Sequence, residues 1–267
     1  MAIVCRPRSL PASKMADAAR RAVTINPANA IEHRVVLRTP VGRRGGPRRL
    51  ALLKGRRWPV TGVKLSVQFL DKPPKDLRAR ILSHMNAWGK TTNVLFTETS
   101  STGQVRIARL DRPDDMAGYW SYIGTEILEI DKDEPTLNLD SFTMKVSEAE
   151  FKRVVRHEAG HTLGFEHEHM RSDLVKRIDP AKAIAFFDRD QGWTEAETRA
   201  QVLTPLSEAS LMGTTESDPT SIMCYQLPGS IMKDGKPIVG GRDINARDFE
   251  FAASVYPKKV PATRRRR

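Results

Sequence analysis

Three histidines within eleven residues constrain this chain more than any other feature of its sequence. His157, His161 and His167 lie in the string HEAGHTLGFEH. Residues four positions apart lie about 40° apart around a helix, so His157 and His161 point to the same side. Gly164 can adopt the positive φ that ends a helix and turns the chain, which lets His167 approach the other two. The spacing therefore predicts a helix, a glycine turn and three imidazoles that converge.

The residue types in this string indicate the chemistry of a hydrolytic metal site. Three neutral imidazoles can hold one Zn²⁺ and leave a fourth position for water, which is typical of catalytic rather than structural zinc. Zinc lowers the pKa of such a water toward about 7 and polarises a carbonyl oxygen. Glu158 lies about 100° from His157 around the helix, too displaced for a third ligand but close enough to take a proton from that water. We therefore predict His157, His161 and His167 as metal ligands and Glu158 as the catalytic base.

The residues around this string predict an α+β fold. Ser147 and Glu150 fit a capping box, which predicts that the metal-binding helix begins at 147 and runs to 163. Residues 63–69 alternate apolar and polar side chains, the period of a half-buried strand. Further strands are expected at 94–98, 105–108, 118–124, 127–130 and 136–139, and further helices at 76–88, 181–187, 194–203 and 249–256. Strands come first and helices follow, which favours α+β over a repeating βαβ order.

Two motifs together resemble a known clan of enzymes. The extended histidine string resembles the zinc-binding motif of the metzincin zinc endopeptidases. Further along, residues 221–225 read Ser-Ile-Met-Cys-Tyr and resemble the clan's Met-turn, which lies beneath the zinc, with Met223 as its methionine. Residues 164–173 match the pattern Gly-Phe-x-His-Glu-x-x-Arg-x-Asp of astacins (peptidase family M12A) and astacin-like or matrixin-like bacterial zinc domains. The resemblance implies a zincin fold, with a twisted, mostly parallel sheet, an active-site helix and a C-terminal subdomain after the zinc-binding turn.

The same resemblance implies roles for single residues and for partners. Tyr225 matches a tyrosine that lies on the zinc side and swings to stabilise the oxyanion, so it is expected to be catalytic. Cys224 stands where astacins carry a histidine. The implied activity is that of a metalloendopeptidase (EC 3.4.24 class) with one catalytic Zn²⁺ and a polypeptide substrate bound as an extra strand at the sheet edge. Residues 118–124, or the strand just after them, are the expected edge. A monomer is the expected state, and secretion is the family expectation.

Three residues near the site leave alternatives open. His169 could compete with His167 as the third ligand, but the Gly-x-x-His spacing favours His167 and predicts that His169 lies beside the ligands or is exposed. Cys5 could act as an inhibitory thiolate on zinc, as in pro-segments of the related matrixins. The sequence Cys-Arg-Pro at residues 5–7 does not match their switch well, so the sequence disfavours that role. Cys224 is expected to be a small buried apolar residue.

Charge divides the chain into three parts. The net charge is +12, but residues 1–64 carry 15 basic and 2 acidic side chains, and residues 258–267 carry 6 basic and no acidic ones. We interpret residues 1–57 as a basic, flexible lead or pro-segment, 58–257 as the catalytic domain and 258–267 as a basic tail. No aromatic residues alternate with the cations, so no specific nucleic-acid partner is expected. Met15 is an alternative start of the chain.

Several classes of protein are excluded or disfavoured. No run of about 18 apolar residues exists, so no transmembrane segment is expected. No secretory signal is recognisable at the start, which leaves the compartment open. Two cysteines exclude a disulfide framework, and no G-x-S-x-G motif points to a serine hydrolase. The main alternative is a catalytically silent zinc-binding interaction domain of the same fold, although such a domain would not need Glu158.

Overall fold

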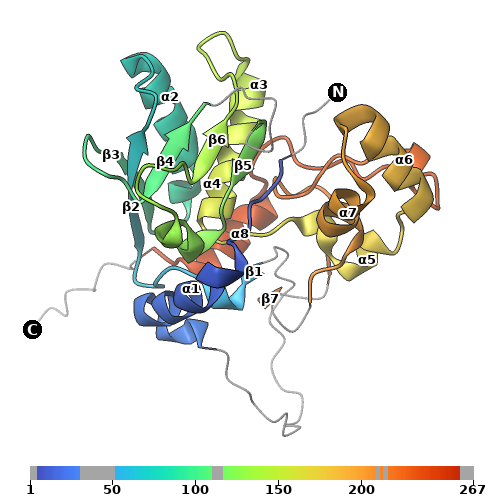
Figure 1. Cartoon of the computed structure of the whole chain (residues 1–267), viewed down its shortest axis with the longest axis horizontal. Helices are drawn as coiled ribbons and strands as arrows, with labels where there is room; N and C mark the ends of the chain where they lie inside the picture. Colours follow the sequence, from blue (N-terminus) through green and yellow to red (C-terminus); the bar gives the residue numbers. More distant parts are fainter. Residues whose placement is uncertain (1–4, 31–51, 110–116, 208–210, 213–215, 259–267) are drawn as a thin grey trace, which may run out of the picture.

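A five-stranded sheet forms the left part of the computed structural model in the view of Figure 1. The structure describes residues 5–30, 52–109, 117–207, 211–212 and 216–258. The strand order of this sheet is β3-β2-β4-β6-β5. The strands β2, β3, β4 and β6 run parallel, and β5 is antiparallel to β6. Their bounds are β2 Val63–Phe69, β3 Val94–Glu98, β4 Val105–Ala108, β5 Tyr119–Ser121 and β6 Leu137–Leu139. The expected mostly parallel sheet is confirmed, and β5 forms one of its edges.

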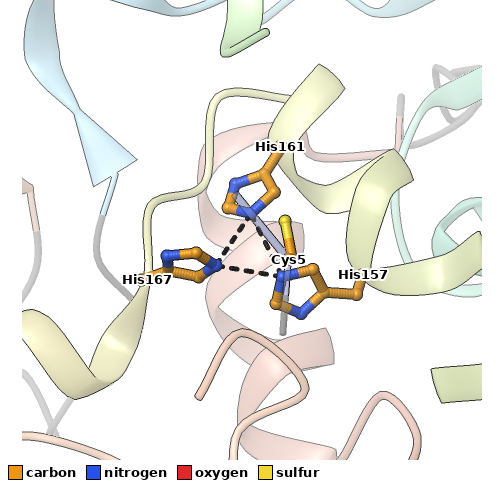
Figure 2. A group of neighbouring side chains, drawn as sticks. All are labelled: Cys5, His157, His161 and His167. Atoms are coloured by element: carbon orange, nitrogen blue, oxygen red, sulfur yellow. Dashed lines mark hydrogen bonds between the residues drawn. The ribbon is translucent and has the colours of Figure 1, made fainter. Parts of the chain in front are cut away.

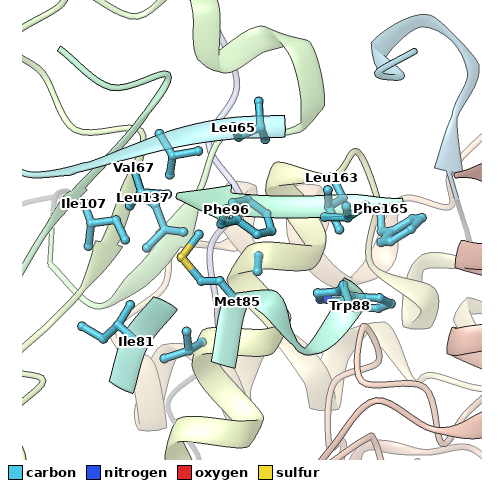
Figure 3. Packing of buried hydrophobic residues seen from close by; sticks show 14 of the residues in the cluster. Leu65, Val67, Ile81, Met85, Trp88, Phe96, Ile107, Leu137, Leu163 and Phe165 are labelled. Atoms are coloured by element: carbon cyan, nitrogen blue, oxygen red, sulfur yellow. The ribbon is translucent and has the colours of Figure 1, made fainter. Parts of the chain in front are cut away.

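One face of the sheet packs on helices and forms the main core (Figure 3). In β2 the apolar positions alternate as expected, so that Leu65 and Val67 are buried while Lys64 is exposed. Helix α2 (Lys75–Met85) continues into a 3₁₀ turn, η3 (Asn86–Lys90), and together they carry Met85 and Trp88 into this core. The active-site helix lies beside α2, so the sheet positions that helix through shared apolar contacts.

The active-site helix is continuous but not uniform. It consists of α3 (Glu148–Glu150), a π-helical turn η5 (Phe151–Val155) and α4 (Arg156–Thr162). The Ser147 hydroxyl accepts a hydrogen bond from the Glu150 backbone at 3.2 Å, so the predicted start is confirmed. The Glu150 carboxylate binds the Arg153 guanidinium at 3.0 Å, one turn further along. The ion pair therefore uses the carboxylate that the predicted capping box assigned to the helix start.

A C-terminal subdomain follows the turn at Gly164, as expected, and has an apolar cluster of its own. Its last helix packs back on the main core through Phe251, Ala252 and Val255. None of the described helices is long and apolar enough to cross a membrane. The elements of this half of the chain are η6 Glu168–Met170, α5 Ser172–Val175, α6 Pro180–Gln191, α7 Glu195–Thr198, the π-helical η7 Arg199–Leu203, η9 Gly229–Ile231 and α8 Ala246–Val255.

Two parts of the structure differ from what the sequence predicts. The strand expected at 127–130 is wrong, because residues Gly124–Glu129 form a 3₁₀ helix, η4, that begins at a glycine with φ of 56°. An apolar run this short fits both the period of a helix and that of a strand, so it does not distinguish the two. The basic lead also contains folded structure: α1 (Ala12–Ile25) packs against η4, followed by η1 (Pro27–Asn29). Shorter elements are η2 Lys54–Arg56 and the antiparallel pair β1 Leu52–Leu53 with β7 Leu211–Met212.

The core makes Trp88→Ala a test of this packing. Trp88 is fully buried, its indole N–H donates to the Arg156 carbonyl at 2.9 Å, and its ring lies 5.1 Å from that of Phe165. We expect the substitution to lower the free energy of unfolding by about 3–5 kcal/mol, measured by urea denaturation. Leu95→Ala is the matched control, because Leu95 is 48% exposed on β3 and should change stability by less than about 0.5 kcal/mol. Equal losses in the two variants would contradict the packing described.

Candidate active site

A glycine turn carries the chain from the second histidine to the third. Helix α4 ends at Leu163, and Gly164 adopts φ of 97°. The Gly164 N–H donates to the His161 carbonyl at 2.8 Å and the Phe165 N–H donates to the Gly160 carbonyl at 3.0 Å. These two bonds form a Schellman motif, which reverses the chain direction. The turn role predicted for Gly164 agrees with this geometry, and His167 is thereby brought back to the helix.

The structure brings His157, His161 and His167 together at one point (Figure 2). All three pairs of Nε2 atoms lie 3.1 Å apart. A tetrahedral zinc ion with bonds of about 2.0–2.1 Å holds its nitrogen ligands about 3.3 Å apart. The donor set and its spacing therefore fit zinc with little change.

Two of these rings are oriented by a hydrogen bond from Nδ1 to a backbone carbonyl, and this bond sets the direction of the Nε2 lone pair. His157 Nδ1 donates to the Ile222 carbonyl and His161 Nδ1 donates to the Phe165 carbonyl, each at 2.7 Å. Their Nε2 atoms are then unprotonated and face each other, an arrangement that a cation stabilises. Burial lowers the pKa of His157 to about 4, and it also lowers the pKa of His161 and His167. All three imidazoles are consequently neutral near pH 7, the form that binds metal.

Glu158 borders a cavity beside the histidines. Its side chain is buried, and burial raises its pKa to about 8. The cavity is lined by Tyr119 of the edge strand, Glu158, Tyr225 and Cys5. The Cys5 thiol donates to Glu158 Oε2 at 3.3 Å. A carboxylate in this position can exchange a proton with a group at the metal site.

The Met-turn lies directly against the active-site helix. The Cys224 N–H donates to the Ser221 carbonyl at 3.0 Å, which closes the turn, and Met223 is fully buried. A Cβ atom added to Gly160 would lie 2.5 Å from the Met223 sulfur, so the glycine permits this close approach. The same turn supplies the Ile222 carbonyl that accepts from His157. The Met-turn therefore fixes the orientation of the His157 ring through this hydrogen bond.

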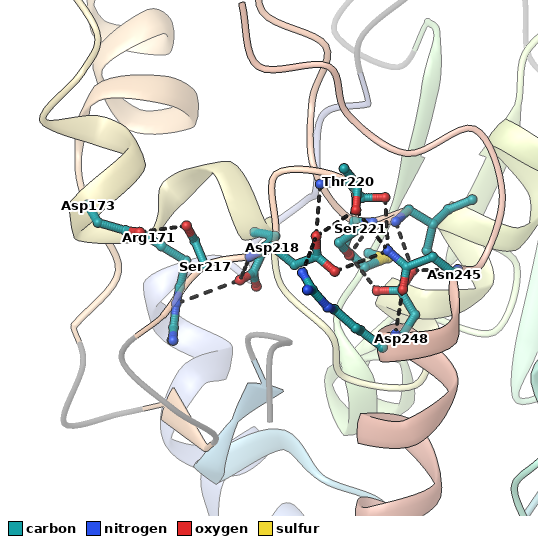
Figure 4. A network of polar contacts seen from close by, with 12 residues as sticks. Arg171, Asp173, Ser217, Asp218, Thr220, Ser221, Asn245 and Asp248 are labelled. Carbon is teal, nitrogen blue, oxygen red and sulfur yellow. Dashed lines mark hydrogen bonds and ion pairs between the residues drawn. The ribbon is translucent and has the colours of Figure 1, made fainter. Parts of the chain in front are cut away.

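A buried aspartate from the last helix holds the Met-turn in place (Figure 4). Asp248 accepts from the Ser221 hydroxyl at 2.7 Å and from the Ile222 N–H at 3.0 Å. It also accepts from the Asn245 N–H at 3.0 Å, so the cap of α8 and the turn share one carboxylate. Burial raises the pKa of Asp248 to about 6. The role of Asp248 was not predicted from the sequence, although the Asn245–Asp248 spacing is that of a helix cap.

The family-pattern residues after the third histidine contribute to the same region. Glu168 is buried, accepts from the Asp218 N–H at 3.0 Å, and its own N–H donates to the Met223 carbonyl at 2.9 Å. The buried Arg171 lies with its Nε 3.8 Å from Glu168 Oε1. Asp173 accepts from the Ser217 hydroxyl at 2.5 Å. These side chains therefore connect the segment after His167 to residues 217–218, which precede the Met-turn.

His169 lies beside the ligand cluster and is buried, so the exposed alternative is wrong. Its ring stacks on Tyr225 at 3.8 Å, and its Nε2 donates to the Gln201 carbonyl at 2.9 Å. Both ring nitrogens are used in this way, because Nδ1 accepts from the Tyr225 N–H at 3.4 Å. The ring thus supports Tyr225 while His167 faces the other two histidines.

Tyr225 and Cys5 complete the site. The Tyr225 ring lies 4.3 Å from the His167 ring, and its hydroxyl donates to the backbone carbonyl of Cys5. The Cys5 sulfur lies with the three histidine nitrogens in one group, in which all ligand atoms are within 4.8 Å of one another. The sequence disfavoured a role for Cys5 at the metal, yet the fold places its sulfur beside the three histidines.

The comparisons with known proteins agree with this architecture. Residues 52–227 match the Astacin (Peptidase family M12A) family model. The chain is 34% identical over 190 residues to the zinc metalloproteinase nas-27 of Caenorhabditis elegans, an alignment that covers 68% of this chain and 36% of nas-27. The chain thus spans about a third of the length of that relative. One structure of myroilysin aligns with a TM-score of 0.72 and 27% identity over 79% of this chain and all of that one. A second, a crystal structure of myroilysin, gives 0.56 and 26% over 82% of this chain and 94% of that one.

The fold and the family match define the class as a zinc metalloendopeptidase of the metzincin type. The chain belongs to the astacin family, peptidase family M12A. One catalytic zinc is the cofactor of this family, and the buried histidine cluster is compatible with it. The sequence-based expectations of the family, the fold, the enzyme class and the cofactor are confirmed.

The carboxylate behind the Met-turn gives a prediction. Asp248→Ala leaves the buried N–H of Ile222 and the hydroxyl of Ser221 without this acceptor, so we expect a loss of about 2–4 kcal/mol in the metal-free protein. The affinity for zinc should also fall, because His157 loses its fixed orientation. Urea unfolding with a chelator and zinc titration measure the two effects. Glu250→Ala is the control, since Glu250 is exposed on the same helix, and unchanged zinc affinity in Asp248→Ala would refute the positioning role.

Proposed function

We propose that this domain hydrolyses peptide bonds of polypeptide substrates, with His157, His161 and His167 as zinc ligands and Glu158 as the catalytic base. The observation that carries the proposal is the convergence of three Nε2 atoms, 3.1 Å apart, beside a buried carboxylate. Zinc, when bound by these ligands, supplies a Lewis acid that activates water and polarises the scissile carbonyl.

Glu158 handles the proton in this proposal. Its carboxylate takes a proton from the attacking water and delivers it to the leaving amine, which is why one residue serves as base and then acid. Burial supports this role, because it raises the carboxyl pKa to about 8, a range in which the group can both accept and release a proton near neutral pH. Glu158 lines the cavity beside the histidines, so its carboxylate lies where the reaction is proposed to take place.

Tyr225 stabilises the oxyanion in the proposed mechanism. Its hydroxyl donates to a backbone carbonyl, that of Cys5, which has the chemical character of a substrate carbonyl. Stacking on the buried His169 holds the ring at the edge of the histidine cluster. A hydroxyl that donates to an uncharged carbonyl donates more strongly to the charge that develops in the transition state.

The substrate is proposed to bind as an extended strand along β5. This strand lies at the edge of the sheet, and its carbonyls already accept from an extended segment: the Arg6 N–H donates to Tyr119 and the Arg8 N–H donates to Ser121, each at 3.0 Å. Main-chain pairing of this kind binds a polypeptide with little dependence on its sequence. A monomer suffices, because the histidines, Glu158 and the edge strand all come from one chain.

Exchanging the carboxylate for an amide separates catalysis from metal binding. Glu158→Gln should retain zinc and lose about 10²–10⁴-fold or more in kcat/KM, because the amide cannot accept the proton. Both the reference and the variant carry Cys5→Ala, which removes the thiol that contacts Glu158. Hydrolysis of casein and of a fluorogenic peptide measures activity, and elemental analysis measures zinc. A zinc-loaded variant as active as its reference would reject the proposed base and favour a different mechanism.

Removing one ligand tests the metal site itself. His161→Ala should lose bound zinc and the protease activity together, since two imidazoles hold the ion far more weakly than three. A chelator should inactivate the unmodified site in the same way, with activity restored by added zinc. His169→Ala serves as the comparison, because His169 lies outside the predicted ligand set, and its zinc content should remain near one ion per chain. Loss of zinc only in His169→Ala would overturn the ligand assignment.

A further inference from the structure

An arginine at the start of the described chain lies next to the histidine cluster. Cys5 Sγ is within 4.8 Å of the ring nitrogens of that cluster, and Arg6 is the following residue. The Arg6 N–H donates to the Tyr119 carbonyl of β5 at 3.0 Å, and its side chain contacts α7, so the chain passes between these two elements (Figure 1). Because β5 is the edge proposed for the substrate, the Arg6 side chain occupies a position that a substrate residue near the scissile bond can take.

Two side chains of the C-terminal subdomain bind the Arg6 guanidinium. Its central carbon lies 5.0 Å from the centre of the Trp193 ring, within the range of a cation–π interaction. Its Nη1 lies 3.4 Å from Glu197 Oε1. A guanidinium both stacks on aromatic faces and pairs with carboxylates, so these two side chains are the groups that suit an arginine. Trp193 and Glu197 are called the cation subsite below.

The turn between α6 and α7 fixes the position of Trp193. Gly192 adopts φ of 66°, which ends α6, and the Trp193 N–H donates to the Phe187 carbonyl at 3.2 Å. The Trp193 ring is buried and stacks on the Phe187 ring, with 4.8 Å between centres and 13° between planes. These contacts do not involve Arg6. The aromatic surface is therefore preorganised, and a bound cation does not have to pay for its ordering.

The start of α7 fixes the position of Glu197. The Thr194 N–H and hydroxyl donate to Glu197 Oε2 at 2.8 and 2.9 Å, which forms a capping box. These hydrogen bonds lower the pKa of Glu197, so its carboxylate is charged at neutral pH. Since the cap uses Oε2, Oε1 is left to face a cation. The cap thus holds a negative charge beside the Trp193 ring.

We propose that Trp193 and Glu197 form a substrate subsite for a basic side chain, so that the enzyme prefers arginine, and next lysine, within two residues of the scissile bond. The proposal rests on the proposed function, because it requires a polypeptide to bind along β5. An aromatic face beside a carboxylate favours a cation over a neutral side chain and repels an acidic one. Arginine binds better than lysine, because its planar group stacks and pairs at the same time.

The exposure of the ion pair limits the size of this preference. The Arg6 and Glu197 side chains are 37% and 43% exposed, so water and salt screen their attraction. The cation–π contact and the ion pair should each contribute a factor of about three. Together they predict a preference of about tenfold for arginine over citrulline, which has the same shape without the charge.

Paired peptides measure the preference with the subsite intact. The zinc-loaded full chain with Cys5→Ala, the reference of the Glu158→Gln experiment, cleaves a peptide library, and mass spectrometry locates the scissile bonds. Arginine and lysine should be enriched at one position within two residues of the bond. A fluorogenic peptide with arginine there should have a kcat/KM about tenfold above that of its citrulline counterpart. No enrichment, or equal kcat/KM values, would overturn the subsite. No cleavage of any peptide would instead overturn the proposed function.

Exchanging Glu197 for glutamine tests the charge. Glutamine can still accept from Thr194 and complete the capping box, so Glu197→Gln removes the charge with the helix start retained. The arginine-to-citrulline ratio of kcat/KM should fall about threefold. Glu195→Gln is the matched control, because Glu195 lies in the same turn of α7 and pairs with Arg199 at 2.7 Å. An unchanged ratio in Glu197→Gln, or an equal fall in the control, would contradict the assignment.

Two exchanges of Trp193 test the aromatic surface. Trp193→Leu should lower the arginine-to-citrulline ratio about threefold, and Trp193→Phe should retain part of the preference, because phenylalanine keeps a weaker π face. Each ratio is taken within one preparation, so it does not depend on the fraction of the variant that folds. A ratio that stays at the reference value in Trp193→Leu would remove the ring from the subsite.

Salt provides a readout that a purely structural role of Glu197 would not change. Raising sodium chloride from about 0.05 M to about 1 M screens the ion pair, so the arginine-to-citrulline ratio of the reference chain should fall about threefold. In Glu197→Gln the ratio should change by a clearly smaller factor, because no ion pair remains to be screened. The same salt dependence in both chains would contradict an ion pair between Glu197 and the substrate.

Discussion

Three imidazole nitrogens that face one another inside a protein are the constraint on which the rest of this structure depends. Two of them, Nε2 of His157 and of His161, are unprotonated, so without a cation their lone pairs repel and the fold must hold the rings in place by other contacts. It does so with two backbone carbonyls, from Ile222 and Phe165, each 2.7 Å from an Nδ1 atom. The Schellman turn at Gly164 positions the Phe165 carbonyl, and the Met-turn positions the Ile222 carbonyl. The sheet and α2 then serve to keep the active-site helix fixed against both turns.

Local patterns predicted the parts of the structure that local forces determine. The alternation of 63–69, the helix start at Ser147 and the spacing of the histidines depend on neighbouring residues, and the structure agrees with each. The 3₁₀ helix at Gly124–Glu129 was missed because its apolar residues fit either period, and tertiary packing decided between them.

Contacts between distant segments were beyond the sequence, and Cys5 and Asp248 are the main examples. Cys5 reaches Glu158 across 153 positions of chain, and Asp248 reaches Ser221 across 27. Neither residue has a local pattern that names its partner, since a lone cysteine or a capping aspartate is common in many contexts. Their contacts follow only from the fold, which brings Cys5 to Glu158 and Asp248 of the last helix to the Met-turn.

The Met-turn explains how the site tolerates a departure from the family pattern. Cys224 occupies the position of a histidine in astacins, yet the turn closes through its backbone N–H to Ser221 and is held by Asp248 from behind. Neither contact uses the side chain at position 224. His157 is likewise held by a backbone carbonyl of the turn, that of Ile222. The close approach of Met223 to the active-site helix needs only a glycine at position 160. The geometry of the metal site thus depends on the backbone of the turn and on the carboxylate of Asp248, and these contacts do not need a histidine at position 224.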